Sequence, residues 1–191
     1  MDVSQIQTYL SDAGSAASWL QGMGFINLNS AHKTLVQLAT SGLTIDLVAN
    51  MAAQLEEILP KCADPDMAFN YLERFVAEAR SPLALGALFE RDPTALPALM
   101  QLFSTSRHLS DILISDCAVF ELMRERKGRP VARERLIDTI VGEIEALKHE
   151  ANIMKALRRF KRRETLRIAY GDIVTELPFE TTALQISYLA D

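Results

Sequence analysis

The chain has 191 residues, of which 49% are hydrophobic and 24% are charged, a composition that excludes a disordered protein. Its 25 acidic residues outnumber its 20 basic residues and give a formal net charge of -5. This balance argues against a general binder of polyanions, which usually needs a strongly basic face, so nucleic acid is not expected as a partner.

The first half of the chain predicts a succession of helices. Residues 1–40 predict short helices with a break at the two glycines of SWLQGMGF, and residues 44–59 predict a regular helix. Proline is favoured in the first turn after a capping Asp or Ser, because its missing N–H would be unpaired there. Three further helices are therefore expected to start at Asp64-Pro65, Ser81-Pro82 and Asp92-Pro93.

The second half predicts helices of increasing length. Shorter ones are expected at residues 106–114 and 116–124, followed by a turn at 124–130 and helices at 131–147, 149–176 and 180–190, with Pro178 ending the longest. No alternating run of β-branched residues predicts a strand. The predicted fold is all-α, an irregular array of short and medium helices with one long C-terminal helix and no sheet. We expect a single helical domain over 1–191, with a less regular part at 1–40, an array at 44–147, and a long helix plus terminal helix at 149–191.

The sequence carries no sign of export or of membrane insertion. The opening MDVSQIQTYL lacks the basic and apolar segments of a secretory signal, and no apolar run approaches the roughly 18 residues of a membrane span. Cys62 and Cys117 lie far apart and form no CxxC pair, which is typical of a reducing compartment. We therefore expect a cytoplasmic location and no membrane partner.

No residue pattern in the chain predicts a catalytic centre. The segment that begins at His149 lacks the second histidine of HExxH, and neither GxSxG nor GxxxxGK[ST] occurs. Cys117 has no histidine nearby in sequence and is interpreted as a small buried apolar residue. Gly14-Ser15 and the Asp64/Asp66 pair lie about fifty positions apart, and the acidic pair is better explained as a helix cap. No catalytic, cofactor-binding or metal-binding residue is therefore predicted.

One dense basic segment contrasts with the acidic chain, because five of the six residues from Arg158 to Arg163 are basic. Helical spacing of about 100° per residue places apolar side chains on one face and gathers arginines mostly on the opposite one. Glu164 falls on the apolar side, where an unpaired carboxylate would be costly, so a nearby arginine is its expected partner. The apolar face comprises Ile153, Leu157, Phe160 and Ile168, and the opposite side carries Arg159, Arg162, Arg163 and Arg167.

Two interpretations of this segment remain open. It can be a solvated face whose arginines pair with acids of the preceding helix, namely Glu143, Glu145 and Glu150. It can instead be a docking surface for another domain, for a ligand that carries phosphate or for a protein partner. The candidate interface residues are Arg158, Arg159, Arg162, Arg163 and Arg167.

The same segment carries a family resemblance. The stretch LRRFKRRETLRIAYGDIVTELPFETTALQISYLAD, residues 157–191, resembles part of the bacterial glutamine synthetase adenylyltransferase and adenylyl-removing family. The stretches DPDMAFNYLERF (64–75) and SPLALGALFERDPTALPALMQLFSTSRHLSDILI (81–114) also resemble this family, and GFINLNSAHKTLVQLA (24–39) does so more weakly. The residues that match the family's pattern are Leu157, Arg158, Phe160, Lys161, Arg162, Arg163, Leu166, Arg167, Ile168 and Ala169, then Ile186, Ser187, Tyr188, Leu189 and Ala190.

The resemblance implies the N-terminal helical region of a bifunctional enzyme that regulates nitrogen assimilation. In this family, one nucleotidyltransferase domain removes AMP from glutamine synthetase and a second attaches it, using ATP and Mg²⁺, under the control of glutamine and the PII signalling protein. In the family, the catalytic motif, a Gly-rich turn followed by Asp-x-Asp, comes after the helix that resembles SYLAD, and no residue of that motif can be assigned in this sequence. By resemblance, the partners are the nucleotidyltransferase domain, glutamine synthetase and PII. The chain alone is expected to hold no cofactor and to be inactive.

Two other functions stay open from the sequence. The chain could be a free-standing helical module that binds a protein through the basic surface. It could also bind nucleic acid weakly through residues 158–167, although the acidic balance and the lack of a recognised binding motif argue against this.

Overall fold

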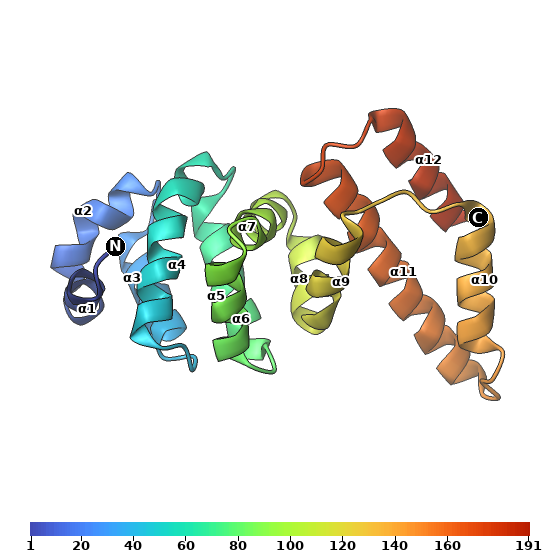
Figure 1. The fold of residues 1–191 in the computed structure, drawn as a ribbon, viewed down its shortest axis with the longest axis horizontal. Helices are drawn as coiled ribbons and strands as arrows, with labels where there is room; N and C mark the ends of the chain where they lie inside the picture. The colour runs from blue at the N-terminus through green and yellow to red at the C-terminus, as the bar shows by residue number, and fades with distance from the viewer. The chain divides into compact units, whose positions relative to one another are not determined.

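A computed structural model describes all residues, 1–191, and confirms the all-α fold, with twelve α-helices, one short 3-10 helix and no strand (Figure 1). Contacts divide the chain into two compact units, Met1–Cys117 and Ala118–Asp191. The prediction of one domain over 1–191 stays a prediction. The helices of the first unit are α1 (Val3–Ser11), α2 (Ala13–Gly22), α3 (Leu28–Ala39), α4 (Ile45–Ile58), η1 (Leu59–Lys61), α5 (Pro65–Glu78), α6 (Pro82–Arg91), α7 (Ala95–Thr105) and α8 (Arg107–Ser115). Those of the second are α9 (Ala118–Arg126), α10 (Arg133–Ile144), α11 (Glu150–Ile173) and α12 (Phe179–Ala190).

The core of the first unit centres on α5, which packs against α3, α7 and α8. The apolar residues of α5 recur every three or four positions, so one face of the helix is buried along its whole length. Phe75 meets Phe103 of α7 edge to face, with ring centroids 5.7 Å apart, and Phe69 meets Phe25 at 5.3 Å. Each of these buried aromatic side chains contributes on the order of 1.5–3 kcal/mol from the removal of apolar surface from water.

Local caps set most of the helix boundaries in this unit. The side chains of Asp64 and Ser81 accept hydrogen bonds from backbone N–H groups in the first turns of α5 and α6, as the Pro-marked starts predicted. The predicted start at Asp92-Pro93 is wrong, because α7 begins at Ala95. The Asp92 carboxylate instead accepts from the backbone N–H and the hydroxyl of Thr94, at 2.9 and 2.7 Å, and closes a turn before the helix.

The second unit is built around α11, which contacts α9, α10 and α12. Its buried apolar residues are fewer than those of the first unit and include Phe120, Leu136, Phe160 and Tyr170. The helix ends at Ile173, earlier than the predicted residue 176, because Glu176 has φ 51° and turns the chain before Pro178. No helix in the structure has the length and apolar character needed to cross a membrane.

Candidate functional site

The arginines of the basic segment divide into an exposed row and a buried group. Lys155, Arg158, Arg159 and Arg162 are all exposed and follow the i, i+3, i+4, i+7 spacing of one helical face. We call these four residues the basic stripe. No acidic residue occurs between Glu150 and Glu164 on the same helix, so the stripe carries no neutralising charge of its own. Its one ion-pair contact joins Arg159 to Glu143 of α10 at 4.0 Å, and at that distance the contact adds little.

Arg163 is held closer to the body of the unit. Its Nη2 donates to Glu143 Oε1 at 2.8 Å, and its guanidinium lies 5.3 Å from the centroid of the Phe160 ring. The side chain is 18% exposed. Pairing with Glu143 belongs to one of the two interpretations that the sequence left open, and the structure contains this contact for Arg163. Arg163 thus links α11 to α10, and only a small part of its side chain is accessible to a partner.

Arg167 is the clearest departure from the sequence interpretation. It was assigned to the basic side of the helix, yet it is 1% exposed. Its Nε donates to Glu164 Oε2 at 2.6 Å, which confirms the expected arginine partner of that buried carboxylate. Its Nη1 donates to the Arg129 carbonyl and its Nη2 to Gln185 Oε1, each at 2.8 Å. Arg167 is therefore an internal connector of the unit, because α11 turns this side toward α12 and the segment before α10.

Gln185 completes this buried polar cluster. Its Oε1 accepts from the Val131 N–H at 2.9 Å while its Nε2 donates to the Val131 carbonyl at 3.0 Å. One carboxamide thus satisfies both backbone groups of a residue in the connection between α9 and α10, much as a neighbouring strand would. The cluster of Glu164, Arg167, Gln185 and the two backbone segments fixes where α10 begins.

The charges of the chain are segregated between the units. The first unit has 6 basic and 13 acidic residues, a net charge of -7, whereas the second has 14 basic and 12 acidic residues, a net charge of +2. These two values sum to the -5 of the whole chain. The acidic net charge of the chain thus comes from the first unit. The basic stripe lies on the second unit, which has a positive net charge.

The surroundings of the two cysteines and of His32 do not favour a catalytic role for these side chains. Burial raises the pKa of the Cys117 thiol, with Glu78 and Asp116 adding to the effect, and burial also raises the pKa of Cys62. Both thiols therefore favour the protonated, unreactive form. His32 Nε2 lies 2.8 Å from the Tyr9 carbonyl and ties α3 to α1.

The residues of this chain do not provide a ligand set for the Mg²⁺ that the family resemblance implies for the full enzyme. No group of three or more His, Cys, Asp or Glu side chains is placed to hold a metal ion. The carboxylates of Asp64 and Asp66 are engaged, the first by the Met67 N–H at 2.9 Å and the second by the N–H groups of Ile26 and Asn27 at 2.9 and 3.4 Å. This confirms Asp64 as a helix cap.

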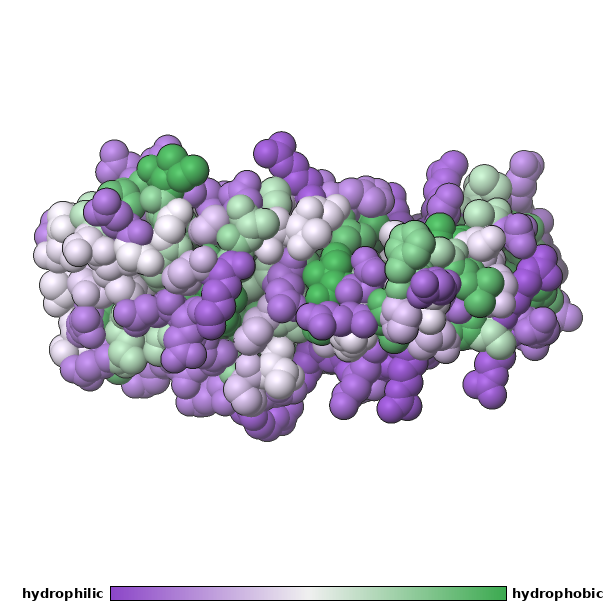
Figure 2. Space-filling view, turned by 90° about the horizontal axis from the view of Figure 1, so that it is seen from above, coloured by the Kyte–Doolittle hydropathy of each residue, from purple (hydrophilic) through white to green (hydrophobic).

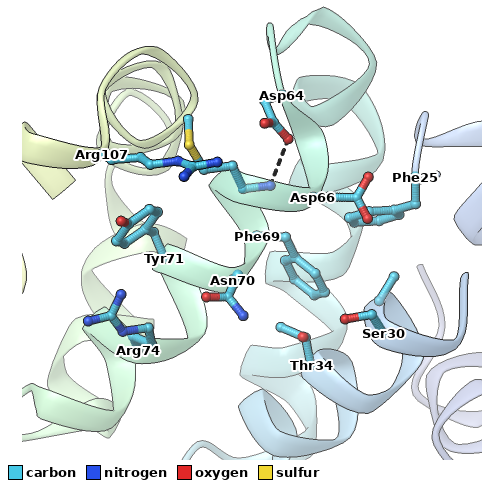
Figure 3. Close-up of a pocket in the computed structure, with 12 residues that line it drawn as sticks. Phe25, Ser30, Thr34, Asp64, Asp66, Phe69, Asn70, Tyr71, Arg74 and Arg107 are labelled. Atoms are coloured by element: carbon cyan, nitrogen blue, oxygen red, sulfur yellow. Dashed lines mark hydrogen bonds between the residues drawn. The ribbon is translucent and has the colours of Figure 1, made fainter. Parts of the chain in front are cut away.

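Sequence reasoning missed a groove on the first unit, between α3, α5 and the start of α8 (Figure 3). It has a volume of about 420 Å³, within the range of small-molecule sites. No signal in the sequence could have revealed it, because its walls come from segments about forty residues apart. The lining includes Phe25, Ser30, Thr34, Asp66, Phe69, Asn70, Tyr71, Arg74 and Arg107.

A comparison with protein families finds a match that covers the second unit and the last helices of the first. The family model for glutamate-ammonia ligase adenylyltransferase matches residues 96–191, about half of the chain. The match takes in the basic stripe, the buried Arg167 cluster and α12. No curated protein and no solved structure matches the chain. The resemblance of residues 24–95 stays a prediction. The chain belongs to the glutamate-ammonia ligase adenylyltransferase family.

Proposed function

We propose that the chain is a non-catalytic helical region of a bifunctional enzyme that attaches AMP to and removes AMP from glutamine synthetase, and so regulates nitrogen assimilation in the cytoplasm. The observation that carries this proposal is the family match over residues 96–191 together with the all-helical fold of that segment. In the proposal, ATP and Mg²⁺ act on the nucleotidyltransferase domain of the same enzyme, and glutamine synthetase and PII are the protein partners.

The proposed role of the second unit is to hold the nucleotidyltransferase domain through the basic stripe. Arg158 and Arg162 extend from the unit with no acidic partner of their own, so an acidic surface of the catalytic domain can pair with them at little desolvation cost. Arg159 joins them. Arg163 contributes an edge only, and Arg167 acts from inside the unit by keeping the helices in place.

Exposed apolar residues of the second unit support a contact of this kind. Seven of the nine large hydrophobic side chains that are exposed in the chain lie in this unit, and two of them, Met154 and Leu157, lie on α11, the helix that carries the basic stripe. Phe179 of α12 is 79% exposed and Ile186 is 55% exposed. Figure 2, viewed from above, shows hydrophobic residues at the surface among hydrophilic ones in the region of α12. Apolar surface bordered by charge is typical of a protein interface.

The first experiment is a blot of source cells with an antibody raised against this chain. A band much larger than 21.3 kDa is the expected result, because the proposal requires an attached nucleotidyltransferase domain. A band near 21.3 kDa would contradict the proposal and favour a free-standing helical module that binds a protein partner.

The second experiment tests the basic stripe in the full enzyme. Reversing two charges with Arg158→Glu and Arg162→Glu should lower the rate of AMP removal from glutamine synthetase by about tenfold or more, since like charges would then meet across the interface. The matched control is Arg135→Glu with Lys148→Glu, which reverses two exposed charges outside the stripe. Equal rates for the two double variants, with unchanged thermal stability, would rule out the stripe as the domain contact.

A further inference from the structure

The groove on the first unit has one cationic end. Arg74 and Arg107 lie on either side of Tyr71, and the Arg74 guanidinium is 5.0 Å from the centroid of that ring (Figure 3). Arg74 has a single exposed ion pair, with Asp111 at 3.7 Å, and such pairs add little stability. Arg107 makes no ion pair in the structure. Two arginines that are this weakly engaged can both turn to an anionic group on a ligand.

The other part of the groove carries neutral hydrogen-bonding groups. The hydroxyls of Ser30 and Thr34 and the carboxamide of Asn70 lie around the Phe69 ring (Figure 3). Thr34 is 5% exposed and is one of the residues that line the groove. The hydroxyl and carboxamide groups of these side chains can donate hydrogen bonds to, and accept them from, a polar ligand in the groove.

A carboxylate completes this hydrogen-bonding end. Asp66 holds the loop at Ile26 and Asn27 through its two oxygens, and each carboxylate oxygen can accept a further hydrogen bond. An acceptor of this kind suits the O–H groups of a ligand. Phe25 and Phe69 supply apolar wall on the same side, where C–H groups of a ligand can pack.

We propose that this groove binds a small polyhydroxylated anion, with its anionic group between Arg74 and Arg107 and its hydroxyls at Thr34, Asn70 and Asp66. The volume of about 420 Å³ accommodates a molecule of sugar-phosphate size. Both an organic phosphate and a sugar acid carry the required anionic oxygens and hydroxyls. The groove lies wholly within the first unit and is independent of the role proposed for the basic stripe.

The test is an NMR titration of the full chain, labelled with nitrogen-15, against four probes. Ribose 5-phosphate and gluconate carry both an anionic group and hydroxyls, ribose lacks the anion, and inorganic phosphate lacks the hydroxyls. Saturable shifts at the amides of Thr34, Asn70 and Arg107 with one of the first two probes, at a Kd at least about tenfold lower than for ribose and phosphate, are expected. Whichever of ribose 5-phosphate and gluconate binds with the lower Kd identifies the anionic group of the ligand as a phosphate or a carboxylate.

Two variants and a control complete the test. Arg107→Gln should weaken binding of the stronger probe by about tenfold, and Thr34→Val, which keeps the side-chain shape, by about threefold to tenfold. Arg91→Gln removes an exposed arginine of the same unit outside the groove and should bind as the parent chain does. Shifts that do not saturate, that appear instead on α11, or that are equal in Arg107→Gln and Arg91→Gln would overturn the proposal.

Discussion

Arg167 and Glu164 form a 2.6 Å charge-assisted hydrogen bond inside the second unit, where both side chains are almost fully buried. They stand three residues apart on α11, so the helix itself brings them together. The surroundings add two further hydrogen bonds, because Arg167 Nη1 donates to the Arg129 carbonyl and Nη2 donates to Gln185. This buried pair and the exposed basic stripe both lie within the segment that matches the family model. The pair stabilises the unit from inside, whereas the stripe faces solvent.

Removing one member of this pair should be costly. Arg167→Met leaves the buried Glu164 carboxylate with only the longer, 3.7 Å contact to Arg163 and should lower the free energy of unfolding by about 3–5 kcal/mol. Urea denaturation followed by circular dichroism measures this loss. Arg162→Met, on the exposed stripe, should change stability by less than about 0.5 kcal/mol. A similar small effect for Arg167→Met would show that the pair does not stabilise the fold.

A second prediction concerns Gly128 and Gly171, whose backbones are in direct contact. A Cβ on Gly128 would lie 2.3 Å from the Gly171 nitrogen, and Gly128 also has φ +61°, which side chains rarely adopt. Gly128→Ala should therefore destabilise the second unit by about 2–4 kcal/mol in urea denaturation.

The control for this prediction is Gly142 of α10, where a Cβ would meet no other atom within 4 Å. Gly142→Ala should raise stability by about 0.5–1 kcal/mol, because alanine favours the helix. If both alanine variants stabilised the chain, the close packing of Gly128 on α11 would be incorrect.

A third prediction contrasts two adjacent residues of α12. Gln185→Leu removes the partner of both Val131 backbone groups and of one Arg167 N–H, and should cost about 2–3 kcal/mol. Ile186→Gln replaces a side chain that is already 55% exposed and should leave the unfolding midpoint almost unchanged. Thermal unfolding of both variants tests the contrast, and the reverse order of stabilities would contradict the described orientation of α12.

A fourth prediction follows from the raised pKa of the Cys117 thiol. A raised pKa keeps the thiol protonated at neutral pH, and thiolate is the form that reacts. Alkylation of the folded chain by iodoacetamide at pH 7.5 should therefore be slower at both cysteines than in the unfolded chain, and the rate should increase as pH rises above the ordinary thiol pKa. Fast labelling of Cys117 at neutral pH would contradict this and would reopen a reactive role.

The sequence predicted the features that local chemistry determines. Asp64 and Ser81 mark helix starts because a capping side chain and a proline act within four residues of each other. The same logic failed at Asp92, where the carboxylate closes a turn with Thr94 instead of capping a helix. A cap and a turn use the same residue types, so the local pattern did not separate them.

The burial of Arg167 and the groove were beyond sequence reasoning for a different reason. Helical spacing places Arg167 on a side of α11 but does not say which segment packs there, and its partner Gln185 is eighteen residues away. The Asp66 contact to Ile26 spans forty residues. The family resemblance, in contrast, depended on the order of residues along the chain, and the family match confirmed it over 96–191.

The segregation of charge has a consequence for handling the protein. A chain with -7 on one unit and +2 on the other has no single electrostatic character, and its net charge averages over two unlike surfaces. At about 0.1 M salt, where the Debye length is only about 10 Å, the field of each unit is confined to its own surface, so a charged matrix or a neighbouring molecule meets the two units separately. Binding of one homogeneous sample to an anion exchange resin and also to a cation exchange resin at neutral pH is then expected, and it would not by itself indicate two species.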